Sequence, residues 1–62
     1  MNSVQFYQFG TAPEAARLGY RLFELFLGSE SDVLEKYAGR DIIAVPSATN
    51  LDGLTEFGIF AR

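Results

Sequence analysis

The densest group of chemically functional side chains is a run of three carboxylates, Glu30, Asp32 and Glu35. Such a run concentrates negative charge, which suits docking on a basic protein surface, either directly or in place of phosphates. Acids in the first turn of a helix also complement the helix dipole, and this structural explanation stays open. We predict that these three residues bind a protein partner.

Side chains suited to catalysis or metal binding are sparse. The sequence contains no Cys, His or Trp, which excludes a disulfide framework, a zinc site of the usual ligands and imidazole acid–base chemistry. Ser47 and Thr49 have no activating base nearby in sequence. Asn50 and Asp52 resemble part of a calcium loop, but Ile59 occupies the position of its bidentate glutamate. We therefore expect no metal, no cofactor and no catalytic residue.

Two arginines supply the alternative hypothesis. Arg17 and Arg21, one helical turn apart, could clamp a carboxylate or phosphate of a ligand. Glu14 and Glu24 lie three residues from them and would equally form surface ion pairs. The alternative function is thus an oligomeric small-molecule-binding protein or enzyme, with a site between chains and Arg17, Arg21 or Glu56 at its mouth.

The composition limits the class of protein. Sixty-two residues suffice for one small domain, which we expect to span residues 1–62. A net charge of −3 argues against direct binding to nucleic acid or to anionic membrane lipids. The most apolar segment, Leu18 to Leu27, contains Arg21 and Glu24, so we expect no membrane span. Without the pattern of a secretory signal, we expect a cytoplasmic protein.

Five elements are predicted to position these side chains. An apolar strand is expected over Ser3 to Phe9. Thr11 and Glu14 have the spacing of a capping box, which predicts a helix that continues through an apolar face and ends at Gly28. A short second helix is predicted from Ser29 or Ser31 to Gly39, because both serines are good caps and glycine favours helix termination.

Two strands complete the predicted fold. They are expected over Asp41 to Ser47 and Leu54 to Ala61, with a turn signal at Asp52 and Gly53 between them. The fold class that results is α+β. We expect a small two-layer β-α-(α)-β-β domain, in which one long helix packs on one face of a three-stranded sheet.

A single helical layer would leave the other face of that sheet uncovered. Tyr7, Phe9 and Phe57 are the aromatic residues predicted to meet a partner there. A chain of this size also buries only about 60% of the surface that its unfolded form exposes, so association would add stability. We expect a homodimer or higher homo-oligomer, and a protein partner.

These observations favour a small, acidic, non-enzymatic protein-binding module that acts as an inhibitor or adaptor. By analogy of size and charge, such a chain suits a phage or mobile-element protein that blocks a host defence, for example an anti-CRISPR. A structural subunit that assembles only with itself is a third interpretation.

Overall fold

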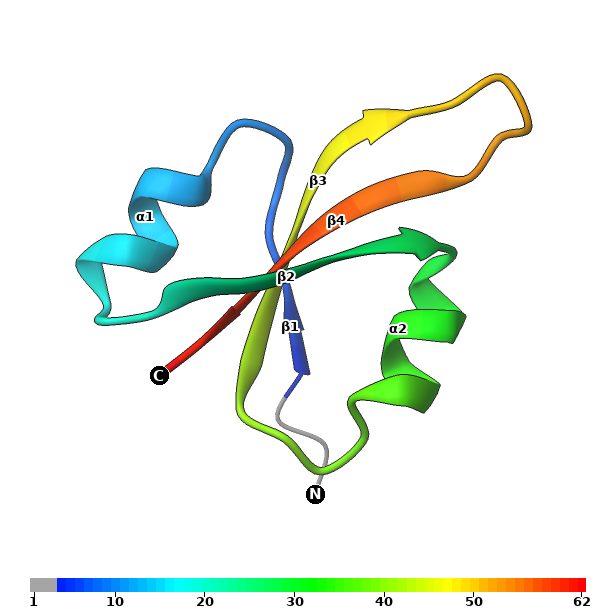
Figure 1. The fold of residues 1–62 in the computed structure, drawn as a ribbon. Helices are drawn as coiled ribbons and strands as arrows, with labels where there is room; N and C mark the ends of the chain where they lie inside the picture. The colour runs from blue at the N-terminus through cyan, green and yellow to red at the C-terminus, as the bar shows by residue number, and fades with distance from the viewer. Residues whose placement is uncertain (1–3) are drawn as a thin grey trace.

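The protein is seen in a computed structural model that describes residues 4–62. Its strands form one mixed sheet in the order β1-β3-β4-β2, and helices α1 and α2 lie on opposite sides of it (Figure 1). In chain order the elements are β1 Val4–Phe6, α1 Ala12–Arg17, β2 Arg21–Gly28, α2 Glu30–Lys36, β3 Ile42–Thr49 and β4 Thr55–Ala61.

Strand pairing places residues that are distant in sequence side by side. β1 runs parallel to β3, whereas β4 runs antiparallel to both β3 and β2. The β3–β4 hairpin closes at the predicted turn, where the Asn50 side chain accepts hydrogen bonds from the backbone N–H groups of Asp52 and Leu54, each at 3.0 Å. Gly53 completes the turn with a φ of +79°, which glycine adopts readily.

The prediction of one long helix is wrong. The helix stops at Arg17, and Gly19 follows with a φ of +87°. The N–H of Gly19 donates to Ala16 at 3.0 Å and that of Tyr20 donates to Ala15 at 3.2 Å. This pair of bonds is a Schellman motif, which satisfies the last carbonyl groups of a helix and turns the chain away from its axis.

The segment after this turn is strand β2, which pairs with β4 from Arg21↔Ala61 to Gly28↔Thr55. The sheet is therefore four-stranded, not three-stranded. Gly28 ends a strand rather than a helix, and a Cβ atom there would lie 2.8 Å from the Phe26 ring. The fold class is corrected to a small α+β domain with a mixed sheet and two short helices.

The remaining elements agree more closely with the sequence. Of the two predicted caps of α2, Ser29 is the one that is used, and it forms a capping box with Asp32. By contrast, the Thr11 side chain does not cap α1 and donates instead to the Gln8 carbonyl at 2.5 Å. The first strand is shorter than predicted and ends at Phe6; its predicted start, Ser3, lies outside the described residues.

Each face of the sheet has its own apolar layer. Because successive side chains of a strand point to opposite faces, Ile42 and Ala44 pack towards α2 while Ile43 and Val45 pack towards α1. The layer under α2 contains Val33, Tyr37, Ile42, Ala44, Phe57 and Ile59. The layer under α1 contains Ala15, Tyr20, Ile43, Val45 and Phe60. Both helices are short, and neither helix of the described chain is long and apolar enough to cross a membrane.

Candidate functional site

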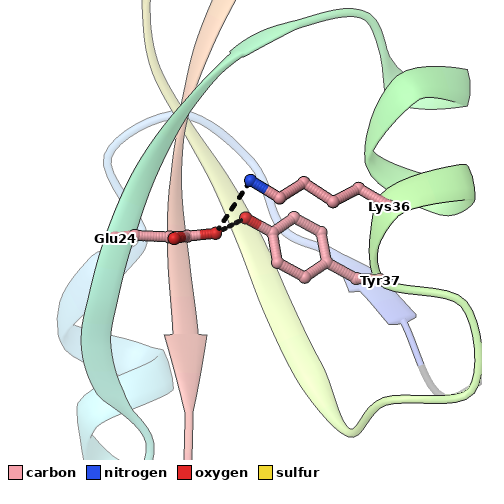
Figure 2. A network of polar contacts seen from close by, with 3 residues as sticks. All are labelled: Glu24, Lys36 and Tyr37. Carbon is pink, nitrogen blue, oxygen red and sulfur yellow. Dashed lines mark hydrogen bonds and ion pairs between the residues drawn. The ribbon is translucent and has the colours of Figure 1, made fainter.

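A polar cluster of Glu24, Lys36 and Tyr37 joins β2 to the end of α2, and the three side chains converge there (Figure 2). The Tyr37 hydroxyl donates a hydrogen bond to Glu24 Oε2. Lys36 Nζ lies 3.3 Å from the same oxygen. Tyr37 is fully buried, so the hydrogen bond to Glu24 satisfies a phenol that has left water.

The protonation states of this cluster are fixed near neutral pH. Burial, followed by the hydrogen bond to Glu24, raises the pKa of Tyr37 to about 12. That hydrogen bond is also the main reason that the pKa of Glu24 lies below its ordinary value, with a contribution from Lys36. Because the phenol stays protonated and the carboxylate stays charged, neither is poised for acid–base catalysis at neutral pH. We interpret the cluster as a structural link between β2 and α2.

Aromatic rings and cations complete this link. The rings of Phe26 and Tyr37 meet edge to face with their centroids 6.0 Å apart. Lys36 Nζ lies 5.2 Å from the Phe26 centroid, and the Arg40 guanidinium lies 5.4 Å from the Phe23 centroid. Both distances are within the range of cation–π attraction. The side of β2 that faces α2 is thus held by side chains of the same molecule.

A second polar cluster ties the end of β4 to the layer under α1. Tyr20 donates a hydrogen bond of 2.6 Å to Asp41 Oδ1, and Arg62 Nε lies 3.8 Å from Asp41 Oδ2. The guanidinium of Arg62 also lies 4.6 Å from the centre of the Tyr20 ring. The hydrogen bond to Asp41 is the main cause of a raised pKa of Tyr20.

The raised pKa of Tyr37 predicts a loss of stability in alkali. The folded-state pKa of about 12 exceeds the ordinary value of 10, so the stabilisation is complete below pH 10 and is lost as the pH rises towards 12. We expect the urea midpoint of wild type to fall more steeply over this interval than that of Tyr37→Phe. Tyr20, which remains in the variant, should still produce a shallow decline. Parallel declines in the two proteins would contradict the assignment.

The three predicted partner-binding acids all lie exposed on α2. Asp32 is committed to the helix cap, because it accepts hydrogen bonds from the backbone N–H and the hydroxyl of Ser29, each at 3.0 Å. The backbone bond is the main cause of its lowered pKa. Glu30 lies in the first turn and Glu35 in the second half of the helix. Their role with a partner stays a prediction.

The three predicted aromatic anchors are not brought together. Phe9 lies in the turn after β1 and is 72% exposed. Tyr7 is partly buried against the layer under α1. Phe57 is only 3% exposed and packs edge to face on Phe6 at a centroid separation of 6.0 Å. Phe57 is therefore inside the domain, because α2 covers the face that the sequence analysis expected to be open.

The residues of the alternative hypothesis are also separated. Arg21 pairs with Ala61 at one end of the β2–β4 ladder, whereas Glu56 pairs with Leu27 near the other end. Glu56 accepts a hydrogen bond of 3.1 Å from Ser47. Over residues 4–62 the surface has no pocket, and the acids of this part of the chain form no group of three that could hold a metal ion.

The most unusual surface of the described chain is the outer edge of β2. Among the strands described, β2 pairs with β4 alone, so its other side is open along eight residues. Four large apolar side chains of this strand are more than half exposed, and we call them the β2 edge surface: Leu22, Phe23, Leu25 and Leu27. Edge strands are usually short or protected by charges, which makes this surface the candidate functional site.

The apolar pattern of these same residues predicted the face of a helix. The signal that could have placed them is Gly19, which is a natural helix stop nine residues before Gly28. Because leucine is a strong helix former, the helix propensity of this segment favoured a helix, and the strand was not predicted.

Comparison of the chain with protein-family models finds no match, and comparisons with curated proteins and with solved structures find none either.

Proposed function

We propose that this chain is a protein-binding module that accepts an extended protein segment as an added strand along β2. The observation that carries the proposal is the open edge of this eight-residue strand beside four exposed apolar side chains. An open edge offers a row of backbone donors and acceptors to an incoming strand. Side chains beside the edge then provide specificity, because an added strand presents alternate residues to one face.

Leu25 and Leu27 define the side-chain part of this site. They pair with Gly58 and Glu56 and alternate with Phe26, which packs towards α2. Both leucines therefore point to the α1 face, where they remain 60% and 52% exposed. An added strand with apolar residues at alternate positions would cover them and remove apolar surface from water.

The acids of α2 support a binding role of the same kind. Glu30 and Glu35 are exposed on the helix that follows β2 directly. Rim charges mainly affect the rate and orientation of encounter, whereas buried apolar anchors supply affinity. We propose that these acids affect the rate and the orientation with which a partner's strand approaches β2. An inhibitor or adaptor would act by occupying such a strand.

Selection from a displayed library of random peptides tests this function. Peptides are selected on the wild-type protein and counter-selected on Leu25→Lys, which places a charge in the β2 edge surface. Leu51→Lys is the matched control, because Leu51 is fully exposed in the β3–β4 turn. We expect peptides with alternating apolar residues that bind wild type and Leu51→Lys alike and bind Leu25→Lys at least about tenfold more weakly. No enrichment, or equal binding to all three proteins, would contradict the proposal.

A further inference from the structure

We propose that the strand added to β2 is β2 of a second copy of this chain, paired antiparallel across a two-fold axis at Phe26. This inference rests on the proposed function, since it uses the same open edge. Antiparallel pairing of one strand with its own copy gives a closed, symmetric dimer and consumes the open edge of both partners. The two four-stranded sheets would then become one continuous sheet.

The register follows from the shape of β2. The strand has a bulge between Leu22 and Glu24, which leaves Glu24 to Gly28 as its regular part. A two-fold axis at Phe26 places Leu25 of each copy opposite Leu27 of the other copy, which gives two such pairs. Because residues opposite each other share a face, four leucines would meet on the α1 face of the joined sheet.

Other registers are less complementary. An axis at Glu24 would oppose two carboxylates, which is unfavourable. An axis at Leu25 would place Phe23 opposite Leu27. These two side chains do not share a face, because Phe23 lies beside Arg40 on the α2 side of the strand and Leu27 points to the α1 side. An axis at Phe26 instead places Glu24 opposite Gly28, so it brings no like charges together across the ladder.

The charges of β2 are compatible with pairing to a second copy. The chain carries a net charge of −3, and the three acids of the 30–35 run lie on α2. β2 holds one base, Arg21, and one acid, Glu24, so the strand itself is neutral. Glu24 is further compensated by Lys36 at 3.3 Å. The charges of β2 itself therefore do not oppose pairing of two copies, and added salt should strengthen the association by screening the repulsion between their net negative charges.

The size of the chain sets the expected affinity. A standard interface buries about 800 Å² per partner, which would be roughly one fifth of the 4165 Å² that this chain exposes. One strand edge and its leucines supply a contact at or below that size. Association should therefore be concentration dependent, and the native mass must be followed over a wide range of protein concentration.

Sedimentation of wild type, Leu25→Lys and Leu51→Lys over a hundredfold concentration range tests the surface. We expect wild type and Leu51→Lys to form the same dimer, and we expect Leu25→Lys to raise the dissociation constant by about thirtyfold or more. Circular dichroism of each variant checks that the fold is retained. If Leu25→Lys is misfolded, Leu27→Lys replaces it. A wild-type monomer throughout, or an edge variant that dimerises as well as wild type, would overturn the proposal.

Disulfide trapping tests the register. The sequence has no cysteine, so Leu25→Cys and Leu27→Cys each introduce a single thiol. One protein is labelled with ¹⁵N, because the two variants have the same mass, and the mixture is oxidised. We expect the mixed 25–27 disulfide to exceed the sum of the two homodisulfides, which random pairing of equal amounts would only equal, since only opposite positions approach to bonding distance. A predominance of 25–25 or 27–27 bonds would overturn the axis at Phe26.

Peptide selection and sedimentation together distinguish this inference from the proposed function. Peptides selected on β2 together with a wild-type monomer would leave the binding module intact and remove the second copy as its occupant. A dimer that persists in the edge variants, with no peptides selected, would remove both.

Discussion

Phe57→Glu is expected to prevent folding of the domain, whereas Phe9→Glu leaves it folded. Phe57 is 3% exposed within the layer under α2. Removing a buried phenylalanine costs about 3–5 kcal/mol, and the new carboxylate would have to leave water as well. A domain of this length has a total stability of only about 3–9 kcal/mol. The loss is therefore comparable with everything that holds the fold together.

The measurement is thermal unfolding followed by circular dichroism. Phe9 is the matched control, because it is 72% exposed in the turn after β1 and its replacement exposes no core. A cooperative transition of Phe57→Glu close to the wild-type midpoint would contradict the placement of Phe57 in the core. It would instead restore the sequence-based hypothesis that both aromatic residues line an open face.

Tyr37→Ala is expected to be the second severe change. Tyr37 is fully buried, packs on Phe26 and holds Glu24 of β2 by a hydrogen bond. Truncation of a buried aromatic residue costs about 3–5 kcal/mol. The change also removes the ring packing on Phe26 and the hydrogen bond to Glu24 that join α2 to β2, so the edge strand should lose order before the β3–β4 hairpin does.

Hydrogen exchange and urea unfolding check this expectation. Tyr37→Phe is the control, because it keeps the ring and removes only the hydroxyl; a single hydrogen bond to a charged group contributes about 1.5–3 kcal/mol. We expect the amides of β2 to exchange faster in both variants, and by a clearly larger factor in Tyr37→Ala than in Tyr37→Phe. Equal destabilisation by the two variants would assign the effect to the hydrogen bond rather than to the packing of the ring.

The contacts of Tyr37 and its neighbours also bear on the candidate binding surface. Tyr37, Lys36 and Phe26 hold the α2 side of β2, while Leu25 and Leu27 remain exposed on its α1 side. The face of β2 that points to α2 is thus fixed within the molecule, whereas its leucines on the α1 face stay available. A strand held in place on one side is preorganised to accept another strand, which lowers the entropic cost of binding.

Much of the local structure could be predicted from the sequence. The two candidate caps, Ser29 and Ser31, and the acids beside them predicted the start of α2 to within two residues, because a capping side chain and the helix dipole act within one turn. Asp52 and Gly53 predicted the hairpin turn for a similarly local reason, since glycine accepts a positive φ. The apolar strand Thr55–Ala61 also lies close to its predicted bounds.

The prediction from sequence failed for the segment from Leu18 to Gly28. Its leucines favour a helix by intrinsic preference, and its apolar residues fit a helical face as well as two faces of a strand. The segment forms a strand because Gly19 ends α1 and β4 offers a partner from Arg21 to Gly28. That choice depends on β4, which lies about thirty residues further along the chain.

The sequence by itself determined the absence of thiol and imidazole side chains, the start of α2 and the β3–β4 turn, because each depends on residue type or on a few neighbours. Only the tertiary structure decided which apolar residues are buried. Phe57 lies inside and Leu25 outside, although both are large and apolar. The physical reason is that burial depends on which face of the sheet each short helix covers, and that is settled by strand pairing over long distances in the chain.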